Sequence, residues 1–410
     1  MKFKFSFLFV IAISLYACKS KPVIHEEHFH IPCGKYLGML DIQGNDLPFV
    51  FEIDSNRNFI LENGEESFVI EDVEFQADSM VVPLHIFDTK LSMTWLESAQ
   101  EFIGYWQKNY VKDYKISLTA KPYVDQKTNR EEAIGFTDVA PKYRVFFESM
   151  LKDSTVSVGE FVQDANELSG TFLTTTGDYR YLRGSVYNND LKLFTFDGEH
   201  AFVFTGKVDT TSIIKGHFYS GKTWHETWVA FPDAEVALED PSTLTNLNEG
   251  FETVDFSGIG IDGDTLSLGS PELAKKALII QIMGTWCPNC MDETAFLSKW
   301  YKNQKPEGLE VITLAFEKKD NFNYAKSRLQ ALKERYGIEY QLLFVGSSDK
   351  EKAAEKLPSL SSVVAYPTLI FMDKKHKVTY IHTGFNGPGT GHHYEQWKLD
   401  FEKLVTELMN

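Results

Sequence analysis

The sequence predicts two structural classes in one chain, an all-β region over residues 31–231, like a sandwich or barrel, and an α/β domain over residues 251–410. Short alternating apolar segments separated by turn residues fill the first region. Residues 232–250 are acidic and polar and contain two prolines, which is typical of a linker. Beyond them, apolar runs alternate with segments of helical periodicity.

Length and composition agree with a folded protein of more than one domain. The chain has 410 residues, more than one hydrophobic core normally serves. Its hydrophobic content of 43% and charged content of 24% are ordinary for a folded chain, and its aromatic content of 14% favours strands. The net charge of −17 repels phosphate backbones, so we expect no nucleic-acid partner.

The first 18 residues have the pattern of a secretory signal peptide. Two lysines precede an apolar run that is too short for a comfortable transmembrane helix, and small Ala17 follows it. The ending Leu15-Tyr16-Ala17-Cys18 resembles the lipobox of bacterial lipoproteins, which implies lipid attachment at Cys18 and a location on the periplasmic side of a membrane. A plain signal peptide cut nearby is the alternative. Residues 19–30 are expected to form a polar tether whose histidines are solvated rather than metal-bound.

Within the β-rich region, strand-like segments are clear but no binding site is. Residues 49–53, 114–118 and 191–196 alternate as strands do, and Asn63-Gly64 and Asp197-Gly198 indicate turns. The polar His217, His225 and Glu226, or the aromatic Tyr219, Trp224 and Trp228, are conceivable sites, although ordinary strand alternation explains both groups better. We expect a recognition or spacer module.

The α/β domain has a definite expected order of elements. A strand buried on both faces over residues 277–283 comes first, and a helix over 291–303 follows it. Asp320 or Asn321 is expected to cap a second helix that Gly337 ends. The remaining expected elements are strands over 311–316, 340–345, 369–372 and 378–381, and a terminal amphipathic helix over 394–408.

Four cysteines divide into three kinds. Cys18 is assigned to lipid, and Cys33 is expected to be a small buried apolar residue, with an intermolecular disulfide as the alternative. Cys287 and Cys290 form a C-x-x-C pair, which closes a loop too small to stabilise a fold, so chemistry explains the pair better. The sequence has no second C-x-x-C or paired histidines to complete a zinc site, so we expect no metal and no cofactor.

The motif around these cysteines resembles the thioredoxin fold, and within it the TlpA-like thiol–disulfide oxidoreductases. The resemblance covers residues 251–410 and rests on Trp286-Cys287-Pro288-Asn289-Cys290, on Glu293 and on Tyr366-Pro367-Thr368. One departure is that Pro288 follows the first cysteine instead of preceding the second, an order more like glutaredoxins. The direction of electron flow is therefore open.

The spacing suits thiol–disulfide exchange. Cys287 at a helix start lies beside free N–H groups and the positive end of the helix dipole, which stabilise the attacking thiolate. Cys290, one turn later, resolves the mixed disulfide. The resemblance implies that Glu293 handles the proton of Cys290, although a carboxylate that merely suits the helix dipole is an equal alternative.

The resemblance also implies the remaining parts of the site and its partners. Pro367 is expected to be a cis-proline facing the cysteines, and Trp286 and Tyr366 to contact substrate. The implied partners are protein disulfide substrates and a membrane electron donor. A peroxiredoxin is the rival enzyme, but such proteins usually have Thr three residues before the cysteine, where this chain has Gly284. A lipoprotein whose β-rich region is the working part is the rival from another class.

Overall fold

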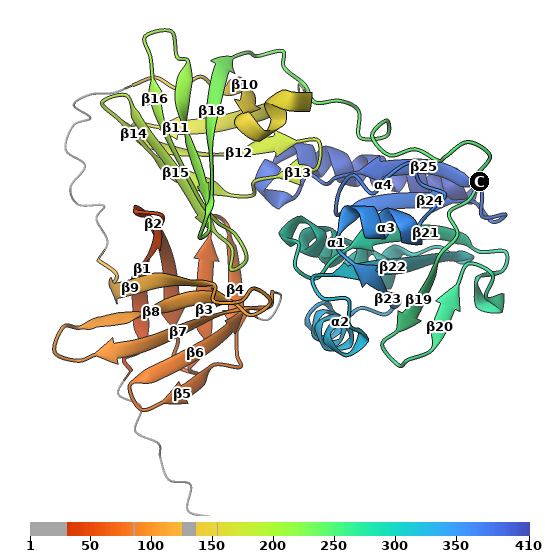
Figure 1. Ribbon diagram of the computed structural model, residues 1–410, viewed down its shortest axis with the longest axis horizontal. Coiled ribbons are helices and arrows are strands. Elements are labelled where there is room, and N and C mark those ends of the chain that lie inside the picture. Colours follow the sequence, from red (N-terminus) through yellow and green to blue (C-terminus); the bar gives the residue numbers. More distant parts are fainter. Residues whose placement is uncertain (1–30, 85–86, 125–136, 154) are drawn as a thin grey trace, which may run out of the picture.

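The computed structural model describes residues 31–84, 87–124, 137–153 and 155–410 (Figure 1). The expected signal peptide (1–18), the lipid site at Cys18 and the tether (19–30) lie outside the described residues. Among the described residues, no helix has both the length and the apolar character needed to cross a membrane.

The β-rich region consists of two separate sheets that pack on each other. The first, called here the N-terminal sheet, is antiparallel. Its first and last strands along the chain, β1 and β9, pair with each other. Its concave core is aromatic, with Phe51, Phe102 and Trp106 fully buried. Its strands are β1 (Gly34–Ile42), β2 (Asn45–Ile53), β3 (Phe59–Asn63), β4 (Glu66–Ile70), β5 (Glu74–Gln76), β6 (Ser79–Leu84), β7 (Thr89–Leu96), β8 (Glu101–Lys108) and β9 (Lys115–Pro122).

The second sheet closes into a barrel because β11 pairs both with β10 and with β12. The inward positions of its strands supply a core that includes Phe172, Phe204 and Trp228. Its elements are β10 (Lys142–Phe147), a 3₁₀ helix (Glu148–Asp153), β11 (Ser157–Asp164), β12 (Glu167–Thr174), β13 (Gly177–Asp178), β14 (Leu182–Tyr187), β15 (Asp190–Phe196), β16 (Ala201–Val208), β17 (Ile214–Ser220) and β18 (Trp224–Pro232).

The C-terminal unit is a mixed sheet with helices, in the order β20-β19-β23-β22-β21-β24-β25. Parallel β21, β22 and β23 form its centre, and β24 runs antiparallel to β21. This is the thioredoxin fold. Its elements are β19 (Ser257–Gly260), β20 (Thr265–Ser267), β21 (Ala277–Met283), α1 (Pro288–Gln304), β22 (Leu309–Glu317), α2 (Phe322–Tyr336), β23 (Gln341–Ser347), α3 (Lys350–Lys356), β24 (Thr368–Met372), β25 (Val378–Thr383) and α4 (His392–Met409), with short 3₁₀ helices at Pro271–Leu273 and Pro388–Thr390.

The expected helix signals are present in the structure. Asn321 caps α2 by accepting a hydrogen bond from the N–H of Tyr324, and Gly337 ends it with φ 59° in the left-handed region. Every residue of β21 is buried, as its apolar run predicted. The short β19, β20 and α3 carry too few residues to show a period and were not expected.

The expectation for Cys33 was wrong. Its side chain is exposed, immediately before β1. The buried position at this entry to the N-terminal sheet is taken by Ile31, which is larger and fully apolar. Cys33 is thus a solvent-accessible free thiol rather than part of the core.

The two β units and the C-terminal unit are neighbours (Figure 1), and each contacts the other two: Arg180 of the barrel pairs with Asp292 of α1, and Nη1 of Arg335 in α2 donates to the carbonyl oxygen of Val69 in β4 at 2.9 Å. Phe196, Ala201 and Val203 of the barrel belong to the core of the N-terminal sheet. Residues 233–250 contain no regular helix or strand, yet Val236 packs against the barrel residues Val158 and Leu173. This segment therefore lies against the barrel instead of hanging free in solvent.

Candidate active site

Cys287 occupies the N-cap of α1, directly after the turn that leaves β21. Its Sγ accepts a hydrogen bond from the N–H of Cys290 at 3.3 Å and donates one to the carbonyl oxygen of Tyr366, also at 3.3 Å. Pro288 fits the first helical position because no N–H is needed there. The Sγ atom thus lies at the start of the helix, where backbone N–H groups have no partner within the helix.

The two cysteines differ in their access to solvent. Cys287 is 7% exposed and Cys290 is fully buried, and both are free thiols. Burial raises the pKa of Cys290 well above its ordinary value, and the hydrogen bond with Cys287 raises it further. Only Cys287 reaches the surface, so an incoming disulfide meets that sulfur first.

Glu293 lies one helical turn after Cys290 and is completely buried. Its Oε2 accepts a hydrogen bond from Nε2 of Gln281 in β21 at 2.8 Å, whereas Oε1 has no partner among the described residues. Burial raises the pKa of Glu293 to about 8, against a smaller lowering by Gln281. The side chain is therefore a carboxylic acid that exchanges its proton near neutral pH.

The Tyr366–Pro367 peptide bond is cis, and the chain at this point lies against the cysteines. The ring of Tyr366 packs edge-on against that of Trp286 at 5.4 Å. The indole N–H of Trp286 donates to the carbonyl oxygen of Phe316 at 3.0 Å, and Nζ of Lys318 lies 3.5 Å from the centre of its ring. The structure thus brings all the residues expected in the site together around Cys287.

One buried acid of this unit went unpredicted. Glu317, at the end of β22, accepts hydrogen bonds from the N–H of Thr285 at 3.1 Å and from its hydroxyl at 2.8 Å. Burial raises the pKa of Glu317. A lone Glu at the end of an apolar strand gave no sequence signal of this contact, which fixes the turn before Trp286.

The barrel also reaches the active-site motif. Nδ2 of Asn289, between the two cysteines, donates to the carbonyl oxygen of Asp178 at 3.3 Å. The Asp178 carboxylate accepts from the N–H of Gly387 at 2.7 Å, in the loop before α4. A Cβ on Gly177 would lie 2.2 Å from Nδ2 of Asn289, so this glycine permits the close approach.

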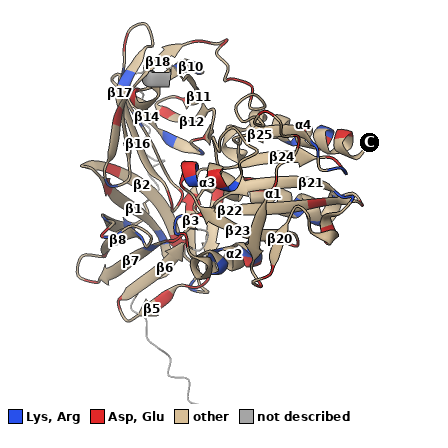
Figure 2. Cartoon of the chain, turned by 45° about the vertical axis from the view of Figure 1, so that its right-hand side comes forward, with Lys and Arg blue, Asp and Glu red and all other residues tan. Residues whose placement is uncertain are grey.

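Arg180 joins all three units through buried ion pairs. It contacts Glu66 of the N-terminal sheet at 2.5 Å, Asp197 of the barrel at 3.5 Å, and Asp292 of α1. Acidic and basic residues of the barrel and the C-terminal unit meet at this junction (Figure 2). Asp292 follows Cys290 by two positions, so the cluster anchors the helix that carries both cysteines.

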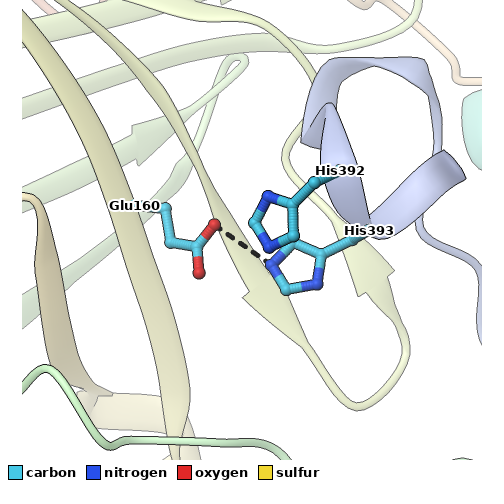
Figure 3. A group of neighbouring side chains, drawn as sticks. All are labelled: Glu160, His392 and His393. Carbon is cyan, nitrogen blue, oxygen red and sulfur yellow. Dashed lines mark hydrogen bonds and ion pairs between the residues drawn. The ribbon is translucent and has the colours of Figure 1, made fainter. Parts of the chain in front are cut away.

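A second polar contact ties the barrel to α4 (Figure 3). Nε2 of His393 lies 3.1 Å from Oε2 of Glu160 in β11, and the ring of His392 lies beside that of His393, tilted by 36° with ring centres 3.9 Å apart. The hydrogen bond with His393 holds the pKa of Glu160 below its ordinary value. These three side chains place possible metal ligands within 4.8 Å of one another, but Lys142 lies 3.8 Å from the same carboxylate and repels a cation.

The polar and aromatic groups singled out in the β-rich region are divided between two faces of the barrel wall. His217, Tyr219 and His225 stack on one another, with Tyr219 and His225 ring centres 4.6 Å apart. Glu226 and Trp228 are buried on the other face of β18, as strand alternation requires. The histidines and Glu226 therefore alternate between the two faces of the strand, as ordinary strand alternation predicted, and do not form a single site.

The C-terminal part of the chain is similar in sequence to known proteins. Residues 250–381 match the AhpC/TSA family. The chain is 26% identical over 140 residues to the thiol-disulfide oxidoreductase ResA of Halalkalibacterium halodurans, covering 33% of this chain and 68% of that protein. For ResA of Bacillus subtilis the identity is 22% over 139 residues, covering 34% and 69%.

A solved structure is similar over the same part of the chain. It is a thiol:disulfide interchange protein of the thioredoxin family from Chlorobium tepidum TLS, with 19% identity, a TM-score of 0.30, and coverage of 40% of this chain and 99% of that chain. The family match falls in the C-terminal unit. The C-terminal unit is a thioredoxin-fold domain similar to the thiol–disulfide oxidoreductases.

Proposed function

We propose that this chain is an extracytoplasmic thiol–disulfide oxidoreductase, TlpA-like, held to a membrane by lipid on Cys18, which reduces disulfides of other proteins. The observation that carries the redox assignment is the asymmetry of the pair. Cys287 is a reachable sulfur at a helix N-cap, while Cys290 is a buried thiol behind it. The signal-peptide pattern supports the location, and the similarity to thiol-disulfide oxidoreductases named ResA supports the reaction.

The exchange proceeds in two steps that balance in sulfur, electrons and protons. The Cys287 thiolate attacks one sulfur of the substrate disulfide, which forms a mixed disulfide and releases the other substrate sulfur as a thiolate that takes a proton. Cys290, once deprotonated, attacks Sγ of Cys287. The substrate leaves fully reduced, and the chain keeps the two-electron oxidised Cys287–Cys290 disulfide. A membrane thiol donor then restores the dithiol.

Glu293 is placed to remove the proton from the buried thiol of Cys290. A thiol with a strongly raised pKa attacks slowly unless a base removes its proton. Glu293 is one turn away, has one oxygen without a partner among the described residues, and has a pKa of about 8, so it takes and returns a proton near neutral pH. It is the proton acceptor for the resolving step.

Pro367 and its neighbours supply the surface on which a substrate lies. Proline has no N–H, so no backbone donor of this position competes with the cysteines or with a bound strand. Tyr366 and Trp286 flank Cys287 with aromatic surface. An extended substrate segment fits beside this turn.

Trapping of the mixed disulfide tests the redox assignment. Both variants below are made in a Cys33→Ser background, because Cys33 is an exposed thiol. Cys290→Ser should accumulate a mixed disulfide on Cys287 with an oxidised protein such as insulin, seen by non-reducing electrophoresis and mapped by mass spectrometry. The matched Cys287→Ser variant should form none. Absence of any adduct with Cys290→Ser rejects the exchange mechanism, and rapid peroxide consumption by the unmutated chain would favour a peroxidase instead.

The membrane assignment has its own test. Cys18→Ala in the full-length precursor should move the protein from the membrane fraction to the soluble extracytoplasmic fraction and abolish labelling by a radioactive fatty acid. Unchanged membrane retention would reject lipid attachment at Cys18.

A further inference from the structure

The mouth of the barrel forms a cavity of about 400 Å³ whose wall includes the active-site motif. It is lined where β16, β17 and β18 meet the β12–β13 turn, and Asn289 of α1 completes it. Mouths of β-barrels are common ligand sites. Asn289 lies two residues from Cys287, so their Cα atoms are at most about 7 Å apart.

The inner walls of this cavity are aromatic. Tyr179, Phe202 and Phe218 pack with ring centres 5.3 to 5.6 Å apart and form its inner surface. Trp224 stands at the rim and is 53% exposed. Aromatic faces attract cations as well as apolar groups.

A carboxylate in the cavity wall favours a cation over an apolar group as the occupant. Glu226 lines the cavity and is only 8% exposed. It accepts hydrogen bonds from the N–H of Ser149 at 2.8 Å and from the indole N–H of Trp224 at 3.1 Å, both neutral donors. Within the part of the chain that the structure describes, it has no ion-pair partner. A nearly buried carboxylate without a cation is costly, and a basic side chain would relieve that cost.

We propose that the barrel mouth is a substrate-recognition site that binds a lysine or arginine side chain of a protein substrate, near the disulfide that Cys287 attacks. The inference rests on the proposed exchange function and adds a substrate preference to it. The net charge of −17 favours approach of basic partners in addition. The barrel, covering Asn289, is then the part of the enzyme that chooses among disulfides.

Two disulfide peptides that differ at one residue beside a cysteine, lysine in one and norleucine in the other, test this preference. The pre-reduced full chain is mixed with each peptide below saturation, and the second-order rate constant is measured. We expect the lysine peptide to react about ten-fold faster, as one charge-assisted hydrogen bond allows. Glu226→Gln should bring the two rate constants together, chiefly by lowering that of the lysine peptide.

Controls separate recognition from folding. Trp224→Leu, at the exposed rim, should also reduce the preference, and it serves if Glu226→Gln does not fold. His225→Gln, on the opposite face of the same strand, should retain the full preference. The proposed recognition site is wrong if the unmutated chain reduces both peptides at equal rates or reduces the norleucine peptide faster. It is also wrong if the preference for lysine survives in both Glu226→Gln and Trp224→Leu. In each of these cases the exchange function still stands. If the unmutated chain reduces neither peptide, the exchange function fails as well.

Discussion

Replacement of Glu293 by Gln is expected to make the chain more stable at high pH. The pKa of Glu293 is about 8 in the folded chain against an ordinary 4.5, so folding favours its protonated form. The stability that the bound proton provides is complete below pH of about 4.5 and is lost as the pH rises to about 8. Since one pKa unit equals about 1.36 kcal/mol, the full loss is about 5 kcal/mol, with about 3 kcal/mol already lost at pH 7.

The amide that Glu293→Gln introduces is neutral at every pH and lacks this loss. The free energy of unfolding of Glu293→Gln minus that of the unmutated chain should therefore rise by about 3 kcal/mol from pH 4.5 to pH 7 and by about 4 kcal/mol up to pH 9. Urea unfolding of the reduced proteins at several pH values, followed by tryptophan fluorescence, measures this difference. Other titrating groups are common to both proteins and cancel.

The exposed Glu307 of the same unit provides a matched control, because its replacement by Gln removes a carboxylate that folding does not bury. Glu307→Gln should show no comparable rise with pH. A flat difference between Glu293→Gln and the unmutated chain from pH 4.5 to pH 9 would refute the reasoning. Folding would then not raise the pKa of Glu293, and the argument that this side chain exchanges a proton with Cys290 near neutral pH would fail.

Three further substitutions test the contacts around the site. Arg180→Met leaves its buried carboxylates without a cation and should lower the free energy of unfolding by about 3–5 kcal/mol, measured by urea unfolding; a loss below about 1 kcal/mol would contradict a buried network. Gly177→Ala, at φ +143° and against Asn289, should separate the barrel from α1 and increase cleavage of residues 232–250 in limited proteolysis, whereas an unchanged rate would show that the contact adjusts freely. Thr285→Val removes one hydrogen bond to buried Glu317 and should cost about 1–3 kcal/mol in thermal unfolding; an unchanged stability would show that this hydrogen bond does not hold the turn before Trp286.

Local signals in the sequence predicted the C-terminal unit well. The buried strand β21, the cap at Asn321 and the stop at Gly337 each depend on a few adjacent residues, and the structure has all of them. The C-x-x-C pair was also recognised from the sequence, because its spacing and its position directly after a buried strand depend only on nearby residues. The apolar period alone indicated a helix from residue 291, whereas the spacing of the two cysteines placed the helix start at Cys287, which is the N-cap of α1.

The sequence did not predict contacts between residues that lie far apart along the chain. Arg180 and Asp292 are 112 positions apart, and nothing in the surroundings of either shows that they meet. The same holds for Asn289 and Asp178, which are 111 positions apart. Strand alternation was visible in the β-rich region, but closure of the barrel depends on the pairing of β11 with both β10 and β12, which has no local signature. The position of Glu226 in the same cavity wall as Asn289 follows only from that closure.

The place of Arg180 has a consequence for the lifetime of the assembled chain. Two of its partners, Glu66 and Asp292, belong to the N-terminal sheet and to α1, so these two ion pairs form only after the barrel has met both units. Interactions that form after the folding transition state slow unfolding and leave the folding rate nearly unchanged. We therefore expect Arg180 to slow the separation of the assembled units and to leave the rate at which they assemble nearly unchanged.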